Sequence, residues 1–271
     1  MDDTKMAFDV LGRRRFLRGA AAATTAAAFS LAQPGRVRGG DANSRLELGL
    51  VGCGGRGNWL ADLFEKHSTS KIVAVADYFK DRADAAGERF KVEAPRRYVG
   101  LSAYRRLLDS KLDAVVIESP PFFHPEQAAA AVDAGKHVFV AKPAAVDVPG
   151  CLTILEGGRK ATAKKLCFLV DFQTRTSEFY REAARRVRRG DLGTVALAQA
   201  YYQTGSTWGG APAFASPEDR LRHWGRDAAL SGDIIVEQNI HALDVATWLL
   251  DADPLKACGA DLAVSCDTGC L

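Results

Sequence analysis

The chain contains 271 residues, of which 47% are hydrophobic and 25% are charged, and its formal net charge is +3. These values are typical of a soluble globular protein with one large or two modest domains, and they exclude a strongly basic surface for nucleic acid. The six cysteines form no C-x-x-C pair and have no histidine at metal-ligand spacing, so we expect free thiols, no metal site and no disulfide framework.

Residues 13–32 have the pattern of an export signal. Arg13 and Arg14, followed by Phe16 and Leu17, resemble the twin-arginine signature. The uncharged run rich in alanine and threonine that follows is about 14 residues long, whereas a membrane span needs about 20 apolar residues. Small residues before and at Ala32 suit cleavage after that position.

We therefore predict a signal peptide over 1–32 and a linker over 33–45, with export to the periplasm or the extracellular space by the twin-arginine route. That route carries folded proteins, which suits a protein that binds its cofactor in the cytoplasm. No stable membrane span is expected. The alternative is an uncleaved signal that anchors the protein in the membrane.

A glycine-rich loop follows the first predicted strand, residues 46–51, and precedes a predicted helix whose apolar stripe begins at Trp59. In a G-x-G-x-x-G loop the first glycine allows the turn, the second lets the backbone approach a pyrophosphate, and the third permits close packing of the helix. The alternative is a glycine turn without a ligand. In this context the pattern predicts dinucleotide binding by Gly52, Gly54, Gly55, Arg56 and Gly57.

The apolar run KIVAVAD predicts a second strand that ends at Asp77, 20 positions after Gly57. An acid at this place accepts hydrogen bonds from the adenosine ribose, and its charge repels a 2′-phosphate. We therefore expect NAD as the cofactor. Lys80 and Arg82 lie nearby and soften the preference, so NADP is not excluded.

The alternation of strands and helices continues through residue 172. A helix is predicted over 102–110, a strand over 113–120, a helix over 124–135 and a strand over 137–143, followed by one more helix and strand. This order predicts an α/β fold with a doubly wound parallel Rossmann sheet over 46–172.

Four segments of the chain resemble the Gfo/Idh/MocA oxidoreductases: VGCGGRG, VADYFKDRA, IESPPFFHPEQAAAAVDAGKHVFVAKP and SGDIIVEQNIHALDVATWLL. The resemblance covers about residues 46–257 and implies a Rossmann domain followed by an α+β substrate domain. It also implies hydride transfer between a nicotinamide cofactor and a sugar, polyol or related carbonyl compound. Members of the family are commonly homo-oligomers.

The resemblance assigns Lys142 to the reaction. The family pattern after the fifth strand is Glu-Lys-Pro, and this chain has Ala141, Lys142 and Pro143, so the lysine and the proline match and the acid does not. By resemblance Lys142 hydrogen-bonds the reacting hydroxyl and stabilises an alkoxide-like transition state. It also borders the cofactor, as does Pro120 in the loop after the fourth strand.

A second pair, Glu237 and His241, lies four residues apart on a predicted helix, which places both on one face. By resemblance His241 is the general base that takes the hydroxyl proton, and Glu237, where the family usually has Asp, orients the histidine or binds substrate. Asp244 shares this face. Less specific expectations are a structural role for His124, site-lining roles for Gln173 and Arg175, and core packing or a sugar-stacking wall for Trp208 and Trp224.

The substrate domain is expected to begin at residue 173 and to continue to 257, with a helix, a strand over 195–203, a loop and the helix that carries His241. Residues 258–271 contain three of the six cysteines and lack the composition of a sheet, so we expect the second domain to be incomplete, through truncation or a frameshift near Gly259, and its oligomer interface to be incomplete too. Two functions remain open: an exported NAD(P)-dependent oxidoreductase, or a dinucleotide-binding protein without turnover.

Overall fold

The computed structural model describes residues 45–203 and 213–258. The predicted signal peptide, nearly all of the predicted linker, Trp208 and all but the first residue of the cysteine-containing tail lie outside these ranges, so the expectations for them stay predictions. No helix in the described ranges is long and apolar enough to cross a membrane.

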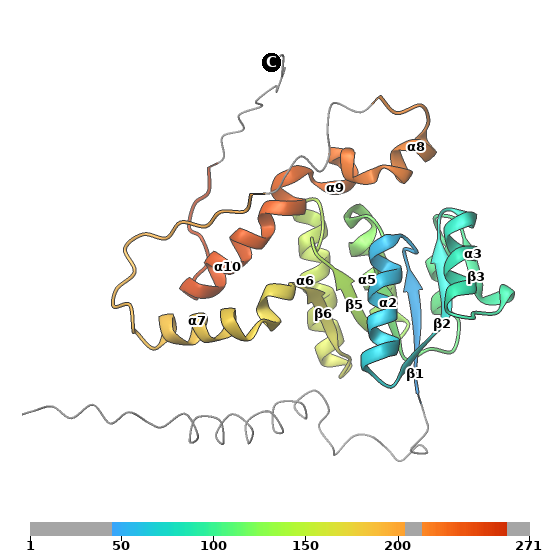
Figure 1. Cartoon of the computed structure of the whole chain (residues 1–271), viewed down its shortest axis with the longest axis horizontal. Coiled ribbons are helices and arrows are strands. Elements are labelled where there is room, and N and C mark those ends of the chain that lie inside the picture. The colour runs from blue at the N-terminus through green and yellow to red at the C-terminus, as the bar shows by residue number, and fades with distance from the viewer. Residues whose placement is uncertain (1–44, 204–212, 259–271) are drawn as a thin grey trace, which may run out of the picture. The chain divides into compact units, whose positions relative to one another are not determined.

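A six-stranded sheet forms the centre of the described chain (Figure 1). All neighbouring strands are parallel, in the order β3-β2-β1-β4-β5-β6. The order reverses between β1 and β4, and such a reversal is where open α/β sheets bind their ligands. The predicted doubly wound Rossmann sheet is confirmed. Its strands are β1 (Leu46–Val51), β2 (Ser70–Asp77), β3 (Arg97–Val99), β4 (Ala114–Ile117), β5 (His137–Ala141) and β6 (Phe168–Asp171).

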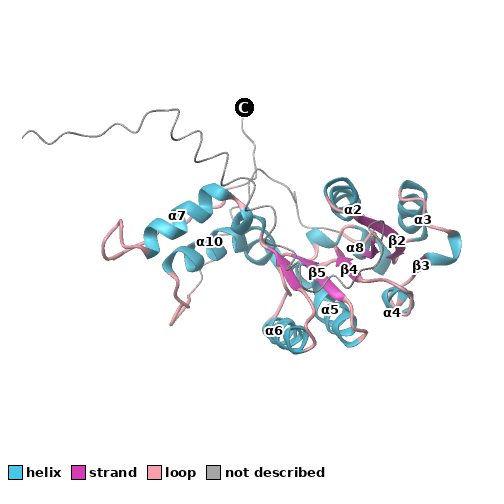
Figure 2. Cartoon of the chain, turned by 90° about the horizontal axis from the view of Figure 1, so that it is seen from below, coloured by secondary structure: helices cyan, strands magenta, loops and turns pink. Residues whose placement is uncertain are grey.

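Helices cover both faces of the sheet (Figure 2). The helices of one face are α2 (Gly55–His67) and α3 (Lys80–Arg89), and those of the other are α4 (Ala103–Leu108), α5 (His124–Asp133) and α6 (Val148–Ala163). Because both faces are covered, the strand interiors are apolar throughout: Leu50, Ile72 and Ile117 are fully buried. The core accordingly forms two clusters, one on each side of the sheet.

Residues 173–258 contribute helices but no strand within the described ranges. These helices are α7 (Glu178–Arg188), α8 (Pro217–Arg222), α9 (Ala228–Ser231) and α10 (Ile240–Leu250), with a short turn at Trp224–Arg226 and a π-helical turn at Ile235–Asn239 before α10. Helix α10 packs against α7. Glu237 therefore lies in the π-helical turn and His241 in the first turn of α10.

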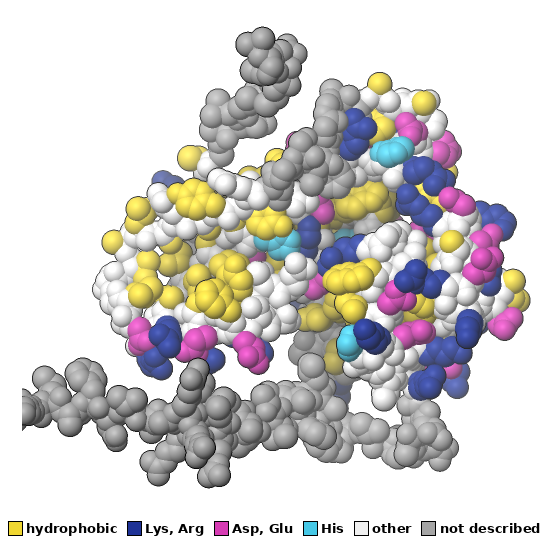
Figure 3. Space-filling view, viewed as in Figure 1, with side chains coloured by type: hydrophobic (Ala, Val, Ile, Leu, Met, Phe, Trp, Pro, Cys, Tyr) yellow, Lys and Arg dark blue, Asp and Glu magenta, His cyan; other side chains and the backbone are white. Residues whose placement is uncertain are grey.

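The strand predicted over 195–203 is not formed. The described backbone there belongs to no sheet, because no described segment pairs with it. A strand forms only when a neighbour satisfies its N–H and C=O groups, so apolar alternation alone does not specify one. Leu197 and Tyr201 are 79% and 73% exposed. Apolar side chains also gather on the face that contains α7 and α10 (Figure 3).

Candidate functional site

The glycine loop joins the end of β1 to α2, and its sharp turn requires glycine at two positions. Gly52 has a φ of +92°, and a Cβ atom there would overlap the Glu118 backbone. A Cβ atom on Gly57 would overlap the Gly52 carbonyl oxygen. These contacts give the first and third glycines of the motif the roles predicted for them: Gly52 allows the turn, and Gly57 allows the helix to pack closely.

The outer side of the loop is open. A Cβ atom built on Gly54 or on Gly55 would meet no atom within 4 Å. Gly54 is the N-cap of α2 and has no side chain to bond the free N–H groups of the first turn, and that turn contains no acidic residue. A helix N-terminus of this kind attracts phosphate through its N–H groups and its dipole. The loop therefore has the space and the donors that a pyrophosphate requires.

Asp77 lies beside this loop, at the carboxyl end of β2. Its Oδ2 accepts a hydrogen bond from the backbone N–H of Cys53 at 2.7 Å, and its Oδ1 accepts one from Phe79 N–H at 2.9 Å. These bonds hold the carboxylate in one orientation, and each oxygen keeps a lone pair for a further donor. The residues present therefore fit a dinucleotide, with the pyrophosphate at the loop and the adenosine ribose at Asp77.

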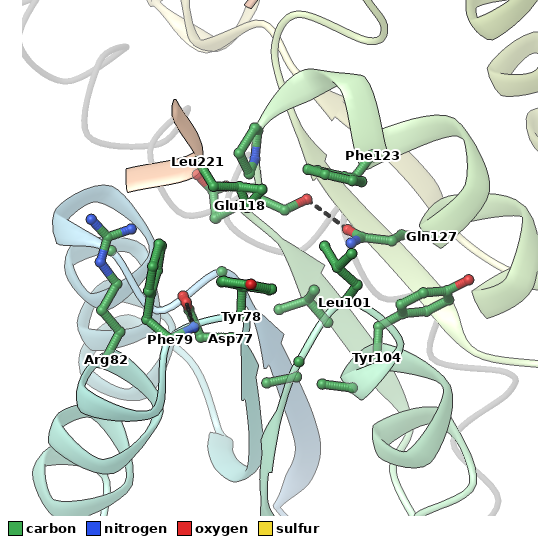
Figure 4. Close-up of a pocket in the computed structure, with 18 of the residues that line it drawn as sticks. Asp77, Tyr78, Phe79, Arg82, Leu101, Tyr104, Glu118, Phe123, Gln127 and Leu221 are labelled. Carbon is green, nitrogen blue, oxygen red and sulfur yellow. Dashed lines mark hydrogen bonds between the residues drawn. The ribbon is translucent and has the colours of Figure 1, made fainter. Parts of the chain in front are cut away.

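A cavity, here called the Asp77 cavity, extends from the glycine loop (Figure 4). Its lining includes Gly52, Gly54, Asp77, Phe79, Arg82 and Pro120. Helix α8 and the following turn contribute Leu221 and Trp224 to the same wall. Trp224 thus lines a cavity. The sequence analysis left two alternatives for this residue, core packing and a sugar-stacking wall.

Contacts between α8 and the start of α3 hold this wall in place. The Arg222 guanidinium lies 3.9 Å from the centre of the Phe79 ring and forms an ion pair with Asp81 at 3.1 Å. The Tyr78 hydroxyl donates a hydrogen bond to Glu218 at 3.2 Å. Sequence reasoning missed this contribution, because no local signal relates α8 to residues about 140 positions earlier.

A second cavity, here called the Lys142 cavity, lies at the carboxyl ends of β4 and β5. Its lining includes Arg56, Glu118, Ala141, Lys142, Glu237 and His241. The structure therefore brings the three predicted catalytic side chains together. Arg56, predicted as a cofactor residue, lines this cavity, whereas Gly52, Gly54, Asp77 and Pro120 line the Asp77 cavity.

The Lys142 ammonium is held by Glu237. Its Nζ donates to Glu237 Oε1 at 2.9 Å and to the Glu237 backbone oxygen, and each of the two side chains is 11% exposed. Burial raises the pKa of Glu237, and the Lys142 charge opposes that rise. Sequence reasoning expected Glu237 to orient His241 or to bind substrate. The structure pairs it with Lys142, and this pair positions the lysine although residue 141 is alanine.

His241 is 8% exposed, and its ring stacks on Tyr202 with the ring centres 5.2 Å apart. Burial lowers the pKa of His241, the nearby Lys142 lowers it further, and Asp244 raises it. The ring is therefore neutral at neutral pH, which is the form that accepts a proton.

Arg175 and Asp244 form a bidentate pair. Arg175 Nη2 donates to Asp244 Oδ1 at 2.6 Å, and Arg175 Nε donates to Asp244 Oδ2 at 3.0 Å. Arg175 is expected to line the site, and in the structure its charge is shared with a carboxylate that is almost fully buried. Gln173 lines the Lys142 cavity, as expected. The buried His124 ring lies 2.7 Å from the Ser119 oxygen and 2.8 Å from the Pro143 oxygen, so it ties together the loops after β4 and β5.

Sequence reasoning also missed Glu118. This residue directly follows β4 and lines both cavities. Its Oε2 lies 3.3 Å from Arg56 Nε, and Arg56 is also paired with Asp171. Burial raises the pKa of Glu118 to about 8. A polar residue directly after a buried strand of a parallel sheet is the signal that would have found it.

Comparisons with known proteins agree with this arrangement. Residues 46–170 match the family model GFO_IDH_MocA, described as an oxidoreductase family with an NAD-binding Rossmann fold. The chain is 30% identical over 213 residues to inositol 2-dehydrogenase 3 of Saccharopolyspora erythraea, covering 78% of this chain and 56% of the relative. It is 28% identical over 222 residues to the scyllo-inositol 2-dehydrogenase (NAD(+)) of Bacillus subtilis, covering 79% and 57%.

Among solved structures, the scyllo-inositol dehydrogenase of Lactobacillus casei with bound NAD(H) and scyllo-inositol is similar with a TM-score of 0.56 and 25% identity. The similarity covers 76% of this chain and 56% of that one. The chain thus spans a little over half the length of the curated relatives it matches. Residues 46–170 thus match the Gfo/Idh/MocA oxidoreductase family model, whose NAD-binding Rossmann fold agrees with the parallel sheet of the structure.

Proposed function

We propose that the protein is an exported NAD-dependent oxidoreductase that acts on a hydroxyl group of a polyol or sugar. The observation that carries this proposal is the Lys142 cavity, where Lys142, Glu237 and His241 meet beside a glycine loop suited to a dinucleotide. The inositol dehydrogenases among the relatives support the polyol class.

In the proposed reaction the neutral His241 ring accepts the hydroxyl proton as the C–H bond of the same carbon breaks. The Lys142 ammonium, held by Glu237, stabilises the negative charge that develops on the oxygen. Bound NAD supplies the acceptor for the hydride. The proton would thus end on His241 and the hydride on bound NAD, and the alcohol would become a carbonyl compound.

For the cofactor, we propose a preference for NAD over NADP. Asp77 carries a negative charge into the Asp77 cavity, which disfavours a 2′-phosphate. Arg82 lines the same cavity and Arg222 lies close to Asp77, and both reduce that penalty. We therefore expect weaker but measurable NADPH binding.

Titration of the full chain with NADH and NADPH, followed by energy transfer from tryptophan to nicotinamide, tests the binding part of the proposal. We expect NADH to bind more tightly, and Asp77→Ala to remove much of the difference. Asp84→Ala on the exposed side of α3 is a matched control, because it removes a carboxylate outside the cavity lining. A folded protein that binds neither nucleotide would refute the proposal.

For localisation, we propose export by the twin-arginine route, on the arginine pair and apolar run of residues 13–32. The alternative is that the uncleaved segment anchors the protein in the membrane. Fractionation of cells that express the chain, with Arg13 and Arg14 both replaced by lysine as the comparison, tests this. Retention of the double variant in the cytoplasm supports the route, and equal export of both forms contradicts it.

A dinucleotide-binding protein without turnover is the second candidate. His241 and Tyr202 separate the Lys142 cavity from an apolar cavity that Leu197, Val245 and Leu249 also line. Within the described residues, the side of the site formed by 195–203 is supported by no sheet. Both candidates predict nucleotide binding, and only the first predicts hydride transfer that is strongly slowed in His241→Ala.

A further inference from the structure

Glu118 has one oxygen atom without a partner. Its side chain is 1% exposed, and Oε1 is buried with no hydrogen bond. Oε2 shares the Arg56 guanidinium with Asp171, so that charge is already divided between two carboxyl groups. Buried polar atoms in proteins are almost always hydrogen-bonded, and an exception calls for a physical explanation. A ligand that donates a hydrogen bond to Oε1 is such an explanation.

The position of Glu118 identifies which ligand would supply the donor. The Glu118 backbone packs closely against Gly52, and the Glu118 Cβ lies 3.3 Å from a Cβ atom built on Gly57. Glu118 thus underlies the glycine loop where the pyrophosphate is proposed to bind. Glu118 also lines both the Asp77 cavity and the Lys142 cavity. Suppose that the adenosine of a dinucleotide lies at Asp77 and its nicotinamide ring lies at Lys142. The nicotinamide half, which runs from the pyrophosphate to the ring, then lies next to Glu118.

The charged groups around Glu118 come from several elements. Arg56 approaches from α2, Asp171 from β6 and Lys142 from the loop after β5, and Glu237 and His241 line the same cavity. Ala141, where the family pattern has an acid, also lines this cavity. Glu118 therefore supplies a carboxyl group to a cavity whose wall lacks the acid expected at position 141.

We propose that Glu118 Oε1 binds the nicotinamide half of the dinucleotide by accepting a hydrogen bond from its carboxamide N–H or its ribose O–H. This inference rests on the proposed dinucleotide binding. It goes beyond the glycine-loop motif, since Glu118 lies outside the G-x-G-x-x-G segment. The donor belongs to the dinucleotide and not to the polyol, because Glu118 lies under the loop that holds the pyrophosphate.

Binding of a ligand series to the full chain tests this. ADP lacks the nicotinamide and its ribose, ADP-ribose lacks only the nicotinamide, and NADH has both. We expect Glu118→Ala to weaken NADH binding about tenfold or more and ADP binding less than about twofold. A loss for ADP-ribose as large as that for NADH assigns the ribose hydroxyl as the donor. A loss for NADH alone assigns the carboxamide.

Two further variants make the result interpretable. Glu118→Gln keeps the side-chain volume and an acceptor oxygen, so we expect NADH affinity closer to wild type than in Glu118→Ala. Glu156→Ala removes an exposed carboxylate of α6 outside both cavities and should change none of the affinities. Thermal melting of each variant, with ADP affinity as a second check, reports whether the loop stays folded.

The outcomes separate this inference from the proposed function. Equal losses for ADP and NADH would show that Glu118 only supports the loop, and unchanged NADH binding in Glu118→Ala would show that it contacts no ligand. Either result overturns the inference about Glu118. If the wild-type chain still binds NADH, the proposed function is not affected. If the wild-type chain binds neither ADP nor NADH, the inference and the proposed function fail together.

Discussion

The Lys142 ammonium is bonded to both the side chain and the backbone oxygen of Glu237, a residue 95 positions later in the chain. This pair joins the end of β5 in the Rossmann sheet to the turn before α10. It fixes Lys142 at the cavity where His241 lies. The relationship makes Glu237 a positioning residue for the lysine in the proposed reaction.

The first prediction concerns Glu237→Ala. Removing one partner of a largely buried ion pair leaves the Lys142 charge without compensation, so we expect a loss of about 3 kcal/mol in the free energy of unfolding. Chemical denaturation measures it. Glu182→Ala on α7, which removes an exposed carboxylate, should cost less than about 1 kcal/mol. Equal costs for the two variants would mean that the Lys142–Glu237 pair does not stabilise the fold.

Removal of the proposed base should separate catalysis from binding. His241→Ala is expected to lower kcat for polyol oxidation about 100-fold or more and to leave NADH affinity unchanged. Steady-state kinetics and the NADH titration provide the two readouts. His67→Ala, at the exposed end of α2, is the matched control and should keep full activity. Activity in His241→Ala equal to that of the control would remove His241 from the mechanism.

The pH dependence of that activity follows from the lowered pKa of His241. Only the neutral ring accepts a proton, so kcat/KM for oxidation should rise with pH as the ring loses its proton and then level off. Because burial and Lys142 lower this pKa, the plateau should begin at a lower pH than for an ordinary histidine, whose pKa is about 6.5. A profile that first levels off well above neutrality would point to a different base.

Glu118 should make NAD⁺ binding depend on pH. The oxidised ring is cationic and favours the carboxylate form of Glu118, whereas the reduced ring is neutral. With a pKa of about 8 in the free protein, Glu118 loses its proton as the pH rises through that value, so NAD⁺ affinity should increase over this range relative to NADH affinity. Titrations at several pH values measure the ratio. The same rise in Glu118→Gln would assign the effect to another group, such as Glu237 or His241.

The wall formed by α8 should slow cofactor release. Arg222 contacts both Phe79 and Asp81 and so holds Leu221 against the Asp77 cavity. Because exposed ion pairs contribute little, we expect Arg222→Ala to accelerate NADH dissociation by only about two- to fivefold. Stopped-flow fluorescence measures the rate. Arg189→Ala, which breaks an exposed ion pair on the segment after α7, should leave it unchanged.

Local sequence signals predicted the Rossmann half of the fold well. The glycine spacing, the apolar strands and Asp77 all act over short distances along the chain, and the structure places them together as expected. Lys142, Glu237 and His241 were predicted as catalytic residues from the family resemblance, and the structure brings them to one cavity.

What the sequence did not predict depends on contacts between distant segments. Glu237 pairs with Lys142, and Arg222 reaches Phe79, only because the chain folds back on the sheet. Glu118 follows a buried strand, but its missing hydrogen-bond partner is visible only in three dimensions. The strand expected over 195–203 was wrong for a related reason, since pairing depends on a neighbour that no local pattern specifies.

The measurement that tests the central proposal most directly is hydride transfer by the full chain. The protein is mixed with NAD⁺ and, in turn, with myo-inositol, scyllo-inositol and simple aldoses, and the absorbance of the reduced nicotinamide is followed. We expect that at least one of these compounds yields NADH in the wild type and that His241→Ala produces NADH from it about 100-fold more slowly or less. Tight NADH binding without turnover of any compound would contradict the enzyme proposal and favour the dinucleotide-binding protein without turnover.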